Sequence, residues 1–256
     1  MKRALIFLTG FAALSMAVSA FETQKELSLP AQGLKRLEIT AGAGSLEVVG
    51  REGLTAVEVT ARVVAPGVRE KDLEDYLQDE VVLELKKAGE AAVLVSRVRG
   101  SRSIIRFRDD ARIDLTVRMP KSLALDIEDG SGDMVVEGTG APVRIDDGSG
   151  DIRVLDVGGP LNIEDGSGEI EVKGVRGDLT IEDGSGGVEV SDVSGDVTIE
   201  DGSGDLRVRR VGGGVTVDDG SGDIDIEGVE KDVRLIDTGS GEVSISGEKG
   251  RVIRSS

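Results

Sequence analysis

The residues best able to do chemistry in this 256-residue chain are aspartates that recur at one position of a repeated turn, Asp-Gly-Ser-Gly. The turn begins every 18 residues, at Asp129, Asp147, Asp165, Asp183, Asp201 and Asp219. A second aspartate follows four of these turns, at Asp133, Asp151, Asp205 and Asp223. Repeated carboxylates offer two chemistries, acid–base hydrolysis and the binding of a hard cation.

Cation binding is the more specific hypothesis of the two. Stacked carboxylates repel one another, and Ca²⁺ relieves that repulsion by taking about six to eight oxygen ligands. We therefore predict, as one alternative function, Ca²⁺ sites built from the two sets of aspartates named above. No other cofactor is expected.

A structural role for the same aspartates is the competing interpretation. An aspartate at the first turn position accepts a hydrogen bond from the backbone amide two residues on, and the glycines permit positive φ angles. Carboxylates that face outward would then be hydrated, screened, or paired with Arg144, Arg153, Arg207 and Arg209.

Hydrolysis is poorly supported. The chain has no histidine and no cysteine, which excludes Ser-His triads, thiol nucleophiles and the usual zinc sites. Stacked aspartates would lie about 5 Å apart, as in retaining glycosidases, but any repeated aspartate gives that spacing. All aromatic residues precede the repeats, so sugar rings would lack platforms there: Phe7, Phe11, Phe21, Tyr76 and Phe107. We predict that the protein is not an enzyme, and a polysaccharide-active β-helix is the weakest alternative.

The repeat also defines the elements that must position these side chains. In one coil, Leu179 and Ile181 alternate with polar residues, and Val188 and Val190 do the same after the turn. Each coil therefore has two short strands with one apolar face each, and Val193 adds a further apolar position. Stacking of coils at about 4.8 Å would line these positions into aliphatic ladders. A sheet of hairpins is the alternative, but a uniform repeat supplies no second layer to cover its apolar face.

These observations predict an all-β fold: a single-chain parallel β-solenoid, or β-helix, with 18-residue coils over residues 121–256. Residues 21–120 are expected to form an irregular β cap, or first rungs, with one short helix at Arg69–Leu77. Gly42-Ala43-Gly44-Ser45 resembles a degenerate copy of the repeated turn. Strands of the cap are expected at 37–39, 46–48, 57–59, 81–85, 92–98, 104–107 and 113–117.

The first 20 residues have the pattern of a secretory signal peptide. Lys2 and Arg3 precede an apolar run, which ends in the small residues Val18-Ser19-Ala20. Cleavage is expected before Phe21. The protein is therefore predicted to be exported, and to be periplasmic, secreted or located at the cell surface.

Acidity is concentrated in the repeats. Residues 125–250 carry 32 acidic and 10 basic side chains, a net charge of −22, whereas residues 21–124 balance 17 acidic against 17 basic ones. A segment this acidic repels nucleic acid and anionic membrane surfaces. The expected partner is a protein or a glycan at the cell envelope, with no nucleic acid and no stable membrane insertion.

Two features resemble a known family. The strand ending in Val117-Arg118-Met119-Pro120-Lys121 and the repeated Gly-Ser-Gly-Asp-Ile unit, as at Gly148–Ile152, are similar to the "putative adhesin" β-strand-repeat family of exported bacterial proteins. The resemblance implies a β-helix-like fold at the cell envelope, in a family of unknown function with no catalytic residues to carry over. The leading hypothesis is a non-enzymatic, adhesin-like binding or scaffold module.

Overall fold

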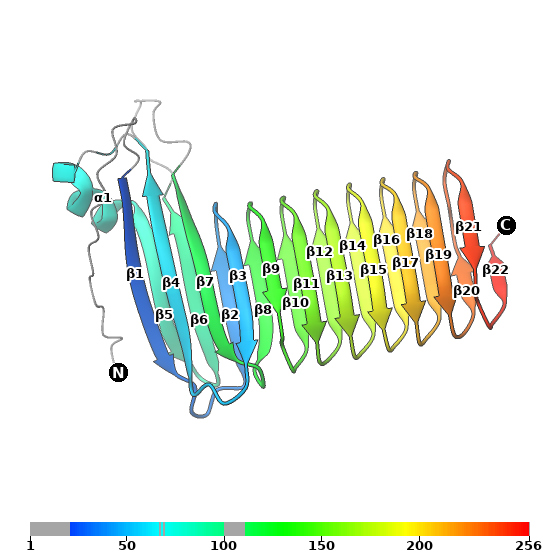
Figure 1. The fold of residues 1–256 in the computed structure, drawn as a ribbon. Coiled ribbons are helices and arrows are strands. Elements are labelled where there is room, and N and C mark those ends of the chain that lie inside the picture. The colour runs from blue at the N-terminus through cyan, green and yellow to red at the C-terminus, as the bar shows by residue number, and fades with distance from the viewer. Residues whose placement is uncertain (1–20, 67, 69, 100–110, 256) are drawn as a thin grey trace.

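The computed structural model describes residues 21–66, 68, 70–99 and 111–255. The predicted signal peptide, residues 1–20, lies outside the described residues, as does the strand expected at 104–107. The described chain forms two 11-stranded sheets. They lie face to face in an elongated body whose coils follow one another along its length (Figure 1).

The regular coils alternate between the two sheets. One sheet takes the strand that precedes each turn, and the other takes the strand that follows it. The sheet of strands that precede the turns contains, in chain order, β8 (Ala124–Asp129), β10 (Val143–Asp147), β12 (Leu161–Asp165), β14 (Leu179–Asp183), β16 (Val197–Asp201) and β18 (Val215–Asp219). The same sheet ends with β20 (Val233–Leu235) and β22 (Val252–Arg254). The strands that follow are β9 (Met134–Glu137), β11 (Ile152–Val157), β13 (Ile170–Val175), β15 (Val188–Val193), β17 (Leu206–Val211), β19 (Ile224–Val229) and β21 (Val243–Ser246).

Successive coils stack in parallel with an offset of one repeat. Leu161 pairs with Leu179 and Ile163 with Ile181, which are 18 residues apart. The five predicted apolar positions are all inside: Leu179, Ile181, Val188, Val190 and Val193 are each at most 2% exposed. Neighbouring strands share these positions, so the core is a set of aliphatic ladders that exists only when coils stack. The predicted β-solenoid is confirmed.

The N-terminal region contributes rungs to the same two sheets and adds antiparallel strands. Its strands are β1 (Phe21–Pro30), β2 (Arg36–Ala41), β3 (Leu46–Arg51), β4 (Ala56–Ala65), β5 (Val81–Ala88), β6 (Ala91–Val98) and β7 (Arg112–Pro120). β2 lies between β6 and β8, and β3 lies between β7 and β9, all in parallel. The β2–β3 coil is therefore inserted between β6–β7 and β8–β9, out of chain order. β1, β4 and β5 pair antiparallel and end the two sheets.

The degenerate turn before β3 behaves as expected. Ala43 forms a parallel bridge with Ser131, in the first regular turn. The amide of Gly44 donates to the Ser131 carbonyl at 3.2 Å, and the amide of Ser131 donates to the Gly42 carbonyl at 3.2 Å. The β2–β3 connection therefore stacks on the regular turns as one of them.

The predicted helix is also present. A short 3₁₀ segment (Glu70–Asp72) leads into α1 (Leu73–Asp79), which buries Tyr76 and lies at the end of the body opposite the C terminus (Figure 1). Within the described ranges, α1 is the only α-helix, and no helix there has the length and apolarity that a membrane crossing requires.

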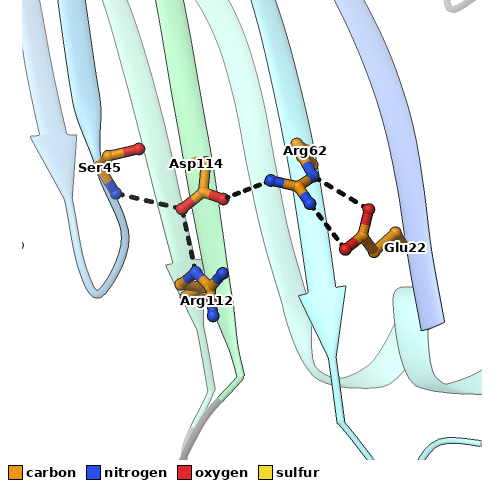
Figure 2. Close-up of polar contacts among 5 residues, drawn as sticks. All are labelled: Glu22, Ser45, Arg62, Arg112 and Asp114. Atoms are coloured by element: carbon orange, nitrogen blue, oxygen red, sulfur yellow. Dashed lines mark hydrogen bonds and ion pairs between the residues drawn. The ribbon is translucent and has the colours of Figure 1, made fainter. Parts of the chain in front are cut away.

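A polar network joins the antiparallel strands to the coil next to them (Figure 2). The Arg62 guanidinium on β4 donates to both carboxylate oxygens of Glu22 on β1, at 3.1 and 2.6 Å. It also lies 3.6 Å from Asp114 on β7, which faces it directly in the strand register. Asp114 in turn accepts hydrogen bonds from the Ser45 amide and the Arg112 side chain, each at 3.2 Å. The Glu22 carboxylate raises the pKa of the Arg62 guanidinium above its ordinary value.

We expect Asp114→Ala to lower the free energy of unfolding by about 1 to 2 kcal/mol, since it leaves two guanidinium groups and an amide without their shared acceptor. Glu22→Ala should cost less, under about 1 kcal/mol, because that carboxylate is half exposed. Urea unfolding of both variants measures the difference. A larger effect at Glu22 would contradict the central position given to Asp114.

Candidate functional site

The first aspartate of each turn is the last residue of a strand, and this position decides where its carboxyl group lies. Side chains alternate along a strand, so Asp183 of β14 is on the same face as Leu179 and Ile181, which line the core. The six turn aspartates are therefore buried: Asp129, Asp147, Asp165, Asp183, Asp201 and Asp219 are at most 7% exposed. They form one row along the solenoid, since each pairs in register with the next.

One carboxylate oxygen of most of these aspartates holds the turn together. Oδ1 of Asp183 accepts the amide of Ser185 at 3.2 Å, and Oδ1 of Asp201 accepts that of Ser203 at 3.0 Å. Asp165 and Asp219 do the same with Ser167 and Ser221. The predicted hydrogen bond to the amide two residues on is confirmed. The structural interpretation of the repeat therefore holds for this oxygen.

The second carboxylate oxygen has no such role. Oδ2 of Asp129, Asp147, Asp165, Asp183, Asp201 and Asp219 is buried and accepts no hydrogen bond from the side chains and backbone that the structure describes. Burial, followed by the neighbouring charges of Asp201 and Asp165, raises the pKa of Asp183 to about 6. Burial, followed by the charge of Asp147, raises the pKa of Asp129 to about 7. The row is thus a column of carboxyl groups whose charged forms repel one another, so these groups take up protons at a higher pH than an exposed aspartate does.

Asp237 shows how strongly the raised pKa of the turn aspartates depends on burial. It begins the seventh copy of the turn, where Thr238 is inserted, and it is exposed. Amides of Gly239 and Thr238 donate to it at 3.0 and 2.7 Å, and they lower its pKa. The same residue type at the same turn therefore titrates in the opposite direction once it leaves the interior.

A second, outer row of carboxylates runs beside the buried one. Its members immediately precede the turn aspartates and point to the outside of the sheet: Asp146, Glu164, Glu182, Glu200 and Asp218. Together with Asp147, Asp165, Asp183, Asp201 and Asp219 and the turn glycines, they line a groove of about 680 Å³ that runs across five coils. We call this groove the carboxylate groove. It is the candidate functional site.

The aspartates that follow the turns form a separate row with a structural task. They are exposed, and each accepts a backbone amide of the next coil. Asp133 accepts the amide of Asp151 at 3.4 Å, and Asp205 accepts that of Asp223 at 3.1 Å. Asp151 and Asp223 accept amides of Glu169 and Glu242, at 3.1 and 2.8 Å. These carboxylates connect neighbouring coils.

The predicted Ca²⁺ ligands therefore lie in two rows. The structure aligns Asp129, Asp147, Asp165, Asp183, Asp201 and Asp219 in one, and Asp133, Asp151, Asp205 and Asp223 in the other. Within the part of the chain that the structure describes, no group of three or more acidic side chains is arranged to hold a metal ion. Ca²⁺ binding by these aspartates stays a prediction.

Sequence reasoning missed two properties of the site. It did not place the turn aspartates inside, although the alternation that buries Ile181 also buries Asp183, two residues later. It also did not recognise Glu164, Glu182 and Asp218 as one side of a groove. The signal was available, because an acidic residue precedes each of the turn aspartates.

Nearly the whole sequence matches one family model. The family model described as "Toastrack DUF4097" covers residues 7–252. The chain belongs to the toastrack family. This confirms the resemblance seen in Val117–Lys121 and the Gly-Ser-Gly-Asp-Ile repeats. No curated protein matches the sequence.

Solved structures with similar folds are distant in sequence. A "putative adhesin" from Bacteroides fragilis is 13% identical, with a TM-score of 0.37 over 93% of this chain and 99% of that one. A "putative lipid binding protein" from Parabacteroides distasonis is 15% identical, with a TM-score of 0.43 over 91% and 97%. A "putative cell adhesion protein" from Clostridium sporogenes is 11% identical, with a TM-score of 0.37 over 91% and 99%.

Proposed function

We propose that this toastrack protein is a non-enzymatic binding module of the cell envelope, whose rigid solenoid presents a repetitive surface to a partner. The observation that carries the proposal is the uniformity of the candidate site. Each coil of the carboxylate groove repeats the same pair, an outer carboxylate and a buried aspartate, over five consecutive coils. Catalysis needs a site in which particular groups differ in environment and role. A uniform row is suited to binding instead.

The use of the carboxylates supports the same proposal. Four turn aspartates each accept a turn amide through one carboxylate oxygen, and this hydrogen bond fixes the side chain in place: Asp165, Asp183, Asp201 and Asp219. A general acid or a nucleophile must reach substrate, whereas the second oxygens of these side chains are shielded from solvent. The fixed geometry favours a surface of constant shape and charge.

Export is part of the proposal. The support for it is the pattern of the first 20 residues, in which Lys2 and Arg3 precede an apolar run that ends in small residues. Cleavage before Phe21 would keep β1, which pairs with β4.

Two measurements test the proposal. N-terminal sequencing of protein recovered from fractionated cells of the source organism should give Phe21 as the first residue, in the envelope or medium fraction. The purified protein should release no reducing ends from a panel of envelope polysaccharides. A cytoplasmic chain beginning at Met1 would overturn the location. Hydrolysis that a single aspartate-to-asparagine change in the groove abolishes would overturn the non-enzymatic role.

A further inference from the structure

The two outer faces of the solenoid differ in how far ion pairs neutralise their acidic side chains. On the sheet that follows the turns, acidic side chains meet arginines on neighbouring coils. Arg153 lies 3.3 Å from Glu171, and Arg209 lies 3.2 Å from Glu189 and 3.8 Å from Asp225. Those charges are largely compensated within the protein.

The sheet that bears the carboxylate groove lacks this compensation. Arg144 lies 2.8 Å from Glu164 and 3.9 Å from Asp146, at one end of the outer row. Farther along, Glu182, Glu200 and Asp218 form no ion pair with any lysine or arginine that the structure describes. Three neighbouring coils therefore present a negative charge with no partner in the described chain.

The buried row increases the negative potential in the same groove. Asp183, Asp201 and Asp219 lie one residue after these outer carboxylates and are at most 6% exposed. Their Oδ2 atoms accept no hydrogen bond, and all three line the groove. Charge behind a low-dielectric wall is poorly screened, so it acts on a cation in the groove without touching it. The outer row and the buried row thus both place carboxylates without basic partners at the same groove. Such a groove attracts positive charge.

The geometry of the rows determines which kind of cation fits. A metal ion needs several oxygens that converge on one point, and here each coil repeats the coil before it, so the carboxylates run in straight lines. Neighbouring carboxylates of one row are separated by about 4.8 Å, the spacing of adjacent strands. Ammonium groups joined by three methylenes are about 5 Å apart in the extended chain, from ordinary bond lengths. A linear chain of amines therefore repeats at nearly the same interval as the coils.

We propose that the carboxylate groove binds a linear polyamine, which lies along the solenoid with one ammonium group per coil beside Glu182, Glu200 and Asp218. Each ammonium group carries up to three donors, enough to bridge carboxylates on adjacent coils. The methylene segments lie over the turn glycines, where no side chain obstructs them. This inference deepens the proposed binding role by naming the chemistry of the partner.

Calorimetric titration of the full chain with norspermidine, whose three amines are joined by three-methylene segments, at about pH 7.5 and about 0.15 M salt, tests the inference. We expect saturable binding that the triple variant Glu182→Gln/Glu200→Gln/Asp218→Asn weakens by about tenfold or more. These three residues make no ion pair with a described basic side chain, so the unliganded variant should melt at the same temperature as the parent protein or higher.

A matched triple variant separates a site from general attraction to an acidic protein. Glu26→Gln/Glu58→Gln/Glu137→Gln removes the same number of charges on β1, β4 and β9, away from the groove, and should change the affinity by less than about twofold. Equal weakening by both triples, or no heat with norspermidine, would overturn the inference. Heat with Ca²⁺ alone that the groove triple abolishes would replace the polyamine with a metal. Either failure leaves the export and hydrolysis tests of the proposed function unaffected.

Discussion

Gly204→Ala is expected to be among the most damaging single substitutions in the solenoid. Gly204 is the last residue of its turn and has a φ of +156°, which side chains rarely adopt. A Cβ atom there would lie well inside van der Waals contact with the carbonyl oxygen of Gly186 on the preceding coil. That obstacle is backbone, so it cannot move without breaking the stack. We expect a loss of more than about 4 kcal/mol, or failure to fold, measured by urea unfolding and far-UV circular dichroism.

Gly53→Ala is the matched control. Gly53 also has a positive φ, +75°, but a Cβ atom there would meet nothing within 4 Å. The change should therefore cost only the strain of the backbone conformation, about 1 to 2 kcal/mol. Equal losses at the two positions would mean that conformation alone, and not the close approach of coils, requires glycine in the turns.

The turn spacing made the solenoid predictable, because coils of equal length can stack only in register. The five apolar positions of one coil then specify every ladder. In the coil that begins at Asp178 these positions are buried as expected: Leu179, Ile181, Val188, Val190 and Val193. The order of the first rungs was not predictable. β2 and β3 are inserted between strands that come later in the chain, and this depends on long-range pairing for which the irregular sequence has no periodic signal.

The site was predictable in composition and only partly in geometry. Repetition identified the turn aspartates, and ordinary turn chemistry identified the amide of Ser185 as a partner of Asp183. The burial of Asp183 was not predicted, because carboxylates are seldom placed inside a protein without a counter-charge. Stacking imposes that burial here: the turn needs an acceptor at the strand end, and the alternation of side chains directs that acceptor inward.

The buried row predicts an unusual dependence of stability on pH. Aspartates in the unfolded chain titrate near pH 3.8, whereas in the folded chain the pKa of Asp147, Asp183 and Asp201 is about 6 and that of Asp129 about 7. Between these values the folded state binds more protons than the unfolded state, so its stability falls as the pH rises. We expect a higher melting temperature near pH 5 than near pH 8. Proteins that depend on paired carboxylates instead lose stability as the pH falls below about 5, and those pairs change it little between pH 5 and pH 8.

Asp183→Asn tests whether the buried row causes this dependence. Asparagine keeps the acceptor for the Ser185 amide, removes one buried charge, and supplies an amide that can donate to Asp165 or Asp201. We expect a gain of about 1 to 3 kcal/mol near pH 8 and little change near pH 5, where the aspartate of the parent protein is largely protonated. Thermal unfolding at both pH values measures the difference.

Glu182→Gln provides the comparison that isolates burial from net charge. It removes one negative charge from the same strand, one residue away, but from an exposed side chain. Relief of general repulsion in an acidic protein would raise the stability of both variants alike. Relief of buried repulsion would raise only that of Asp183→Asn, and only above about pH 6, where the row loses its protons. An equal response of the two variants would show that the turn aspartates are as well solvated as the outer row, and that the interior does not perturb their ionisation.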